Sequence, residues 1–280
     1  MKFSNREFCS FAQNECANFA SQNRTKHPAS TAMLFDIQGG SYVDGPGVRT
    51  TLFFKGCNLN CAWCHNPEGI SPHRQSMFFK DKCTGCGQCR AVCEHEPCVL
   101  CDRCAEVCPV GAKKICGKEY TVEELFEKVH RDKDFYVATG GGVTCSGGEC
   151  MLQIDFLEGF LRRCTQAGIH TAVDTAGHVP FAHFERILPY TDLFLYDIKA
   201  LDNQLHKRLT GVDNQLILSN FEALAQLAPE KLLARVPVIP SANEGEISAI
   251  TEYLAKRAIA AEFLPYHAMG EGKRAALGVV

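Results

Sequence analysis

Residues 50–64 read TTLFFKGCNLNCAWC and join a short apolar run to a loop with three cysteines. The apolar run, 50–54, predicts a buried β-strand. Cys57, Cys61 and Cys64 follow it at the spacing C-x3-C-x2-C. Three thiolates can hold three irons of a four-iron cluster, whereas a cluster that only carries electrons normally takes four cysteines. Because an open coordination position is where a small molecule binds and reacts, the loop predicts chemistry at an iron.

Five further apolar runs predict strands that alternate with helical patterns along the chain. These runs are 142–145, 169–173, 193–196, 232–236 and 261–264. A capping box formed by Thr121 and Glu124 predicts the start of one of the helices between them. Six strands that alternate with helices indicate a parallel sheet with helices outside it. We therefore predict an α/β fold, a partial (β/α)6 barrel similar to a TIM barrel.

Polar or unusual residues come directly after most of the predicted strands. The first strand leads into the cysteine loop, and later ones lead into SGGE (146–149), DTAG (174–177), DIK (197–199) and PYH (265–267), while Arg235 lies within the fifth strand. Ligands of parallel α/β folds bind at the carboxyl ends of the strands. Six separate elements therefore predict one site at one end of the barrel.

Size and composition limit the classes of function. The 280 residues suffice for one large domain, 33–280, with a weakly ordered extension at 1–32 and an insertion at 80–116. A net charge of −3 gives no indication of nucleic-acid binding, and no apolar stretch reaches the length of a membrane helix. Seventeen cysteines without a secretory signal favour cytoplasmic metal binding over a secreted disulfide framework.

The segment 80–116 contains eight cysteines at the spacing C-x2-C-x2-C-x3-C, repeated twice. In two-cluster ferredoxins the fourth cysteine of each run ligates the other cluster. The spacing thus predicts one iron–sulfur cluster on Cys83, Cys86, Cys89 and Cys108, and another on Cys93, Cys98, Cys101 and Cys104. Zinc is the alternative metal for closely spaced cysteine pairs. Only residues 94–97 separate the runs, and so short a loop is stiff, which leaves open whether one cluster or both assemble.

Five short motifs in combination resemble a known family. They are GPGVRT (45–50), WCHNP (63–67), GVTCSGGE (142–149), DIK (197–199) and LPYH (264–267). The cysteine loop alone resembles the radical S-adenosylmethionine (SAM) superfamily. All the motifs together, from about Met33 onward, resemble the glycyl-radical-enzyme activating enzymes, of which the pyruvate formate-lyase activating enzyme is a familiar member. The insertion is similar to that of the subgroup with a two-cluster ferredoxin-type domain.

This resemblance implies a radical SAM oxidoreductase of anaerobic metabolism. In that family the open iron of a [4Fe–4S] cluster binds SAM and the reduced cluster cleaves it. The 5′-deoxyadenosyl radical then abstracts a hydrogen from a backbone glycine of a partner glycyl radical enzyme. No catalytic acid or base on this chain is required. The implied partners are that protein and a low-potential electron donor such as flavodoxin or ferredoxin, without nucleic acid or membrane.

Two other functions are compatible with the cysteines alone. One is a radical SAM enzyme that acts on a small molecule or peptide and uses the insertion for auxiliary clusters. The other is a passive electron carrier or zinc module, which would not cleave SAM. Formation of a glycyl radical on a partner protein would distinguish the activating enzyme from both of these alternatives.

The resemblance also implies the site residues. Cys57, Cys61 and Cys64 would ligate the SAM cluster. The residues that would contact SAM are Trp63, Cys64, His65, Gly147, Gly148, Glu149, Asp197, Ile198, Lys199, Arg235 and His267. As cations, Lys199 and Arg235 suit the SAM carboxylate. Asp174, Thr175 and Asp197 form an oxygen-rich group that would either hold a monovalent cation or hydrogen-bond to Lys199 and nearby backbone.

Overall fold

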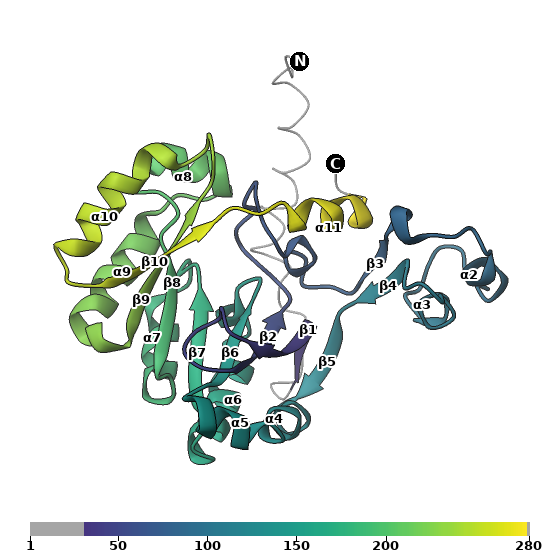
Figure 1. Ribbon diagram of the computed structural model, residues 1–280, viewed down its shortest axis with the longest axis horizontal. Helices are drawn as coiled ribbons and strands as arrows, with labels where there is room; N and C mark the ends of the chain where they lie inside the picture. The colour runs from purple at the N-terminus through teal and green to yellow at the C-terminus, as the bar shows by residue number, and fades with distance from the viewer. Residues whose placement is uncertain (1–30, 279–280) are drawn as a thin grey trace.

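The computed structural model describes residues 31–278; residues 1–30 of the expected extension lie outside the described part of the chain. Eight strands form one curved sheet in the order β10-β9-β8-β7-β6-β2-β1-β5, with helices on its outer side and a small lobe to one side (Figure 1). Strand β1 (Thr31–Ser41) begins two residues inside the segment that the sequence assigned to the extension.

The six strands expected from the sequence form the parallel part of this sheet. They are β2 (Arg49–Phe54), β6 (Gly142–Gly147), β7 (His170–Thr175), β8 (Leu193–Asp197), β9 (Leu232–Val238) and β10 (Ala260–Pro265). Except in β10, whose residues are mostly exposed, these strands are mostly buried on both faces, which explains the continuous apolar runs. Strands β10 and β5 are the two edges of this sheet and do not pair with each other. The barrel is therefore partial, as predicted.

Strands β1 and β5 (Lys118–Thr121) were not expected from the sequence. Strand β1 pairs antiparallel with β2 on one side and with β5 on the other. The outer half of β1 is mostly exposed and contains two consecutive glycines, and β5 is a four-residue edge strand with two charged residues. Neither therefore has the apolar pattern of a central strand.

Helices fill the connections between the parallel strands and cover the outer side of the sheet (Figure 1). They are α4 (Val122–His130), α5 (Lys133–Thr139), α6 (Ile154–Gln166), α7 (Phe181–Ile187), α8 (Asn203–Thr210), α9 (Gln215–Leu227) and α10 (Ile247–Ala255). Helix α11 (Met269–Leu277) instead follows β10 and lies between that strand and the small lobe (Figure 1). The predicted capping box is confirmed, because Thr121 accepts from the Glu124 amide at 3.2 Å and the Glu124 carboxylate accepts from the Thr121 amide at 2.8 Å. Within 31–278, no helix is both long and apolar enough to cross a bilayer.

The lobe projects from the body on a two-stranded antiparallel sheet of β3 (Gln75–Phe78) and β4 (Lys113–Cys116) (Figure 1). It contains the short helices α2 (Gln88–Ala91) and α3 (Arg103–Glu106). Strand β3, which pairs with β4, lies directly before the segment 80–116 of the expected insertion. At its base, a second small core joins Phe35, Met77, Cys116 and Ala276.

Candidate functional site

The cysteine loop is held on two sides by backbone hydrogen bonds. The Gly56 amide donates to the Gly69 carbonyl at 2.8 Å, which fixes the loop to the turn η1 (Pro67–Gly69). The Asn60 amide donates to the Thr210 carbonyl at 2.7 Å, which fixes the loop to the end of α8. These hydrogen bonds fix the backbone that carries all three thiols, at the carboxyl end of β2.

The SGGE turn lies directly beneath this loop and depends on its glycines. Gly147 has a φ of +114°, in the region that favours glycine. A Cβ atom on Gly148 would lie 2.2 Å from the Gly56 carbonyl oxygen and 2.5 Å from that of Gly69. The backbone of the cysteine loop therefore approaches Gly148 so closely that only a glycine fits there.

The three thiols are half-buried and lie close to two cations. Burial raises the pKa of Cys61 to about 12 and also raises the pKa values of Cys57 and Cys64. Lys199 and Arg274 act in the opposite direction on Cys61 and Cys64. Thiolates in so water-poor a site require positive charge, which iron together with these cations would supply. The donor set therefore fits an iron–sulfur cluster.

Lys199 follows the end of β8 and Arg235 lies within β9. Both side chains are buried. Lys199 pairs with Asp197; burial alone would lower its pKa, but Asp197 and Cys61 raise it above its usual range. Arg235 donates to the Val43 carbonyl at 3.0 Å. The adjoining Ile198 is also buried, and its amide donates to the Arg235 carbonyl at 2.8 Å, which ties the ends of β8 and β9 together.

The oxygen-rich group is divided between different partners. Asp174 accepts from the Ser146 hydroxyl at 2.7 Å, and burial raises its pKa to about 6 although Arg235, 3.6 Å away, opposes this. The Thr175 hydroxyl instead donates to the Glu149 carboxylate at 2.9 Å and accepts from the Gly177 amide at 2.9 Å. The Thr175 hydroxyl therefore points to Glu149, whereas Asp174 bonds to Ser146 and Asp197 pairs with Lys199.

Glu149 is fully buried, and its carboxylate points into the protein. It accepts from the Thr175 hydroxyl, from the Ala176 amide at 3.0 Å and from the Met151 amide at 3.2 Å. Burial raises its pKa to about 7. The side chain thus joins the end of β6 to the end of β7. The Glu149 backbone amide donates to the Gly56 carbonyl at 2.7 Å, so that its main chain also supports the cysteine loop.

Aromatic side chains form another wall beside the loop. The rings of His65 and His267 are stacked with centroids 3.7 Å apart, and the Tyr266 ring lies 6.1 Å from that of His65. Burial lowers the pKa of His65, and its Nε2 atom is buried without a hydrogen-bond partner in the described part of the chain. Trp63 is half-buried on the same loop. A bound molecule could satisfy this orphaned nitrogen.

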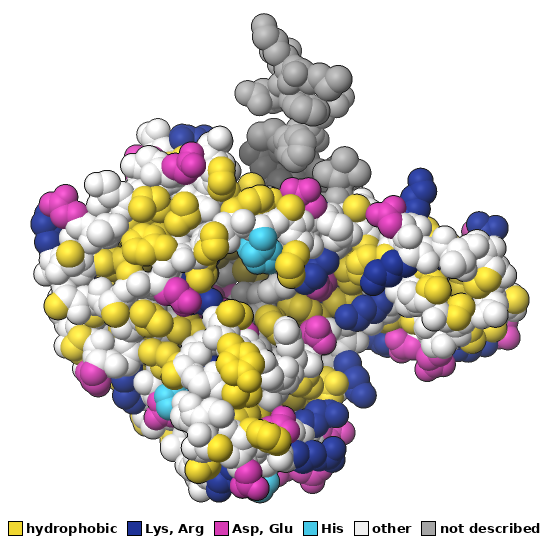
Figure 2. Space-filling model, in the orientation of Figure 1, with side chains coloured by type: hydrophobic (Ala, Val, Ile, Leu, Met, Phe, Trp, Pro, Cys, Tyr) yellow, Lys and Arg dark blue, Asp and Glu magenta, His cyan; other side chains and the backbone are white. Residues whose placement is uncertain are grey.

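Helix α11 supplies contacts that the sequence did not suggest. Arg274 donates to the carbonyls of Cys61 at 2.6 Å and Ala62 at 3.2 Å. Lys273 forms a 2.7 Å ion pair with the buried Glu68. More than 200 residues separate these partners in the chain, and no motif links them, so only the tertiary fold reveals them. In Figure 2 this face is hollowed near its centre, between the region of β10 and α11 and that of β2 and β6.

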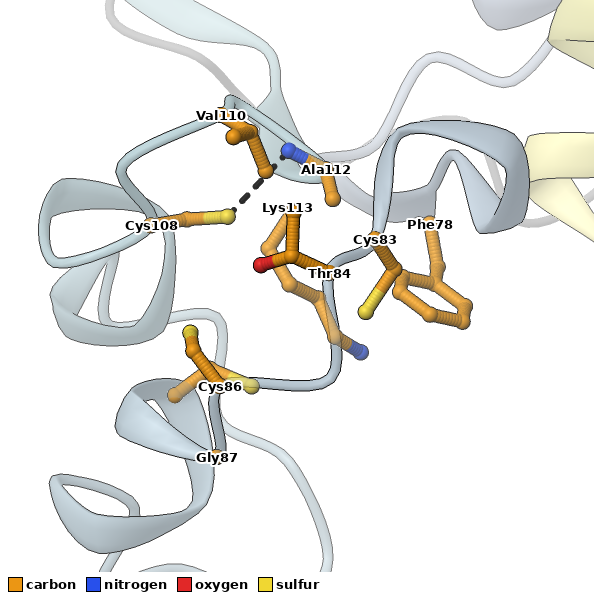
Figure 3. A pocket seen from close by; sticks show the side chains of 10 residues that line it. Phe78, Cys83, Thr84, Cys86, Gly87, Cys108, Val110, Ala112 and Lys113 are labelled. Carbon is orange, nitrogen blue, oxygen red and sulfur yellow. Dashed lines mark hydrogen bonds between the residues drawn. The ribbon is translucent and has the colours of Figure 1, made fainter.

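In the lobe, one pocket brings together the four cysteines that the spacing assigned to one cluster. Cys83, Cys86, Cys89 and Cys108 all line it, together with Phe78 and Lys113 (Figure 3). The Cys108 sulfur accepts from the Ala112 amide at 3.2 Å, and backbone amides, that of Lys113 first, lower its pKa. Amides that favour a thiolate suit an iron ligand.

The second set begins just after α2 and ends within α3. Cys93, Cys98 and Cys101 are exposed and Cys104 is half-buried. Within residues 31–278, no three His, Cys, Asp or Glu side chains are placed to share a single metal ion. A four-iron cluster does not need such convergence, because each thiolate binds a different iron.

Comparison with known proteins is consistent with this site. The Radical SAM superfamily model matches residues 51–254. The trans-4-hydroxy-L-proline dehydratase activating enzyme of Clostridioides difficile is 38% identical over 86% of each chain. The choline trimethylamine-lyase activating enzyme of Oleidesulfovibrio alaskensis is 39% identical over 88% of this chain and 87% of its own.

Among solved structures, Streptococcus suis SuiB is 14% identical over 76% of this chain and 38% of its own, with a TM-score of 0.51, which shows a likeness of fold alone. The matched domain and the two activating enzymes identify the family. The chain belongs to the radical SAM superfamily and, within it, to the activating enzymes of glycyl radical enzymes.

Proposed function

We propose that this protein activates a partner glycyl radical enzyme, with a [4Fe–4S] cluster on Cys57, Cys61 and Cys64 and SAM beside it. When bound and reduced, the cluster supplies the electron that cleaves SAM, and the resulting 5′-deoxyadenosyl radical takes a hydrogen atom from a glycine of the partner. The observation that carries the proposal is the three-thiol loop, fixed above the SGGE turn and next to Lys199.

Two buried cations are proposed to bind the carboxylate of SAM. Lys199 and Arg235 are paired with Asp197 and Asp174, so that each cation is already oriented by an acidic neighbour. Lys199 is electrostatically coupled to Cys61, which supports its place at the cluster edge. An anionic group that arrives here gains charge-assisted hydrogen bonds without a large reorganisation of either cation.

The other end of SAM is proposed to contact the aromatic wall. The stacked rings of His65 and His267 offer a flat surface for adenosine, with Trp63 on the same loop. The unpartnered Nε2 atom of His65 would gain a hydrogen bond there. The turn that contains Gly147 and Gly148 is proposed to contact the amino group of SAM, because it packs directly against the cysteine loop. The Glu149 side chain is assigned the role of supporting that turn.

We further propose that the lobe holds one or two additional [4Fe–4S] clusters that pass electrons to the site. The pocket of Cys83, Cys86, Cys89 and Cys108 supports the first, and its composition supports the crossed arrangement of ligands. The second would use Cys93, Cys98, Cys101 and Cys104. The proposed donor of these electrons is a low-potential protein such as flavodoxin or ferredoxin, and the proposed location, from the thiol content, is the cytoplasm.

The partner is proposed only at the level of its class. Relatives named as activating enzymes of a dehydratase, a lyase and a decarboxylase are 36–39% identical to this chain. Because these identities are so similar, none of the named partner enzymes is favoured over another. The shared element is a protein substrate that must be activated.

Electron paramagnetic resonance tests the proposal. Reconstituted protein, dithionite, SAM and each purified glycyl radical enzyme of the source organism are mixed without oxygen. We expect a stable glycyl radical doublet on one of them, and no doublet with the Cys61→Ala variant. SAM cleavage without a doublet on any partner would instead favour an enzyme that acts on a small molecule or peptide.

A further inference from the structure

In the part of the chain that the structure describes, the base of the lobe joins it to the body. Strands β3 and β4 pair with each other and are not part of the main sheet. The distance and orientation between lobe and body therefore depend on the few side chains that bridge the base (Figure 1). Two of these side chains, Lys55 and Arg74, connect the cysteine loop to the lobe.

Lys55 lies at the end of β2 and is 1% exposed. Its ammonium donates to the Glu68 carbonyl of the cysteine-loop region at 2.5 Å, and to the Gln75 side chain of β3 at 3.0 Å. It also lies 3.9 Å from the Cys116 sulfur of β4. Within residues 31–278 it forms no ion pair with a carboxylate. Burying an ammonium among neutral groups costs desolvation free energy and destabilises the folded chain. We therefore infer a role for Lys55 other than stability.

Arg74 continues the connection outward. Its Nε atom donates to the Gly117 carbonyl at 3.0 Å, and its Nη2 atom pairs with Asp102 at 2.5 Å. Asp102 lies between Cys101 and Cys104, at the start of α3. Arg74 therefore ties the second cysteine run to the base of the lobe.

Gly117 is the point at which the two residues meet. A Cβ atom there would lie 3.0 Å from the Lys55 Cδ atom and 3.2 Å from the Arg74 Cα atom. Lys55 and Arg74 thus both lie against the side of Gly117 on which a Cβ atom would stand. The contacts run without a break from Glu68 beside the cysteine loop, through Lys55, Gly117 and Arg74, to Asp102 in the lobe.

We propose that Lys55 and Arg74 are positioning residues that fix the lobe relative to the cysteine loop and so determine how fast electrons pass between them. This inference rests on the proposed function of the lobe as a carrier of iron–sulfur clusters. Electron transfer slows steeply as the separation of the centres increases, so a loosened base would slow it even with every cluster intact. Each electron that leaves the lobe oxidises it by one electron and cleaves one SAM to methionine and a 5′-deoxyadenosyl radical.

The test is a single-reduction experiment with the full chain. Protein with all clusters is reduced with dithionite, freed of reductant and mixed with SAM in a thiol buffer, which supplies the final hydrogen atom. 5′-Deoxyadenosine should form in a fast phase, from the electron already at the site, and then in a slower phase, from electrons of the lobe. With Arg74→Gln we expect the fast phase and the iron content to be unchanged and the slow phase to be about tenfold slower or more.

Matched variants separate positioning from general damage. Arg163→Gln is the control, because Arg163 is 38% exposed and ion-paired to Glu123, much as Arg74 is 37% exposed and ion-paired to Asp102. Its phases should match those of the wild type. The slow phase of Arg74→Lys should have a rate between those of Arg74→Gln and the wild type, because one ammonium reproduces the two-pronged hydrogen bonding of a guanidinium poorly. Lys55→Met should also slow the slow phase. If this variant does not fold, the test is Arg74→Gln, because the Arg74 side chain is partly exposed.

A second measurement does not depend on the clusters. Hydrogen exchange of the apo chain should be faster within residues 80–116 in Arg74→Gln than in the wild type, with the barrel unchanged. An unchanged slow phase in Arg74→Gln overturns the proposal. A wild type that activates its partner but shows only the fast phase overturns it too and leaves the proposed function intact. A wild type that forms no 5′-deoxyadenosine refutes the proposed function itself.

Discussion

At the scale of single residues, the SGGE turn supports the cysteine loop through both its glycines and its glutamate. Gly148 has no room for a side chain because the cysteine loop lies on it. Glu149 turns its carboxylate inward to Thr175 and the backbone of β7 and η3 (Cys150–Gln153). The sequence places this motif after a strand, but the inward direction of Glu149 and Thr175 depends on buried hydrogen bonds that a sequence does not display.

The substitution Gly148→Ala should prevent the cysteine loop from closing. Its Cβ atom would collide with two carbonyl oxygens that cannot move without opening the loop. We expect loss of the iron bound by Cys57, Cys61 and Cys64, measured by iron analysis and by SAM-dependent changes in the cluster spectrum. Gly159→Ala in α6 is the control, because its Cβ meets only an ordinary 3.6 Å contact and should stabilise the helix by about 0.5–1 kcal/mol.

Glu149 should give the apo chain a pH-dependent stability. Its pKa is raised from 4.5 to about 7 in the folded state, so the folded chain binds the proton more tightly than the unfolded chain. Its contribution to the free energy of unfolding should therefore fall as pH rises from about 4.5 to about 7, by up to ~1.4 kcal/mol per pH unit. Urea unfolding across this range should show a smaller decrease for Glu149→Gln than for the wild type; equal slopes would contradict the assignment.

At the scale of elements, the cysteine loop is held between the SGGE turn, the end of α8 and the distant helix α11. The strand-end rule predicted the first of these contacts, because the carboxyl ends of parallel strands meet. It could not predict α11, which reaches the loop only after the sheet has curved. Arg274 and Lys273 are ordinary charged residues of an amphipathic helix until their partners are known.

Replacing Arg274 should weaken the loop without unfolding the barrel. Arg274→Met removes two hydrogen bonds to the loop carbonyls and one cation near the thiolates. We expect iron to be lost to a chelator about 10- to 100-fold faster, as for other outer-shell changes. Arg162→Met, at an exposed position of α6, should leave the rate unchanged; equal rates for both variants would show that α11 does not support the cluster loop.

Pairs of cysteine variants test how the lobe binds iron. If Cys83 and Cys108 serve one cluster, Cys83→Ser and Cys108→Ser should each cost about four irons, and the double variant should lose no more than either one. Cys83→Ser combined with Cys93→Ser should lose about eight. Losses that add for Cys83 and Cys108 would contradict the crossed arrangement that the pocket supports.

At the scale of the whole molecule, the fold follows from six apolar runs and their alternation with helices, which the sequence displays because central parallel strands are buried on both faces. The antiparallel edge, β1 and β5, could not be predicted, since edge strands are only partly buried. Nor could the outer anchor of the lobe, because Arg74 and Asp102 make contact only once β3 and β4 have paired. The sequence therefore indicates the buried strands and the short motifs, but it does not indicate the contacts between partly exposed elements.

The transfer of deuterium tests the central claim most directly. A partner glycyl radical enzyme is labelled with deuterated glycine and incubated with the reduced protein and SAM, and the 5′-deoxyadenosine formed is analysed by mass spectrometry. The account predicts one deuterium atom in each 5′-deoxyadenosine and a glycyl radical on the partner in equal amount. 5′-Deoxyadenosine that contains no deuterium, formed without a radical on the partner, would contradict it.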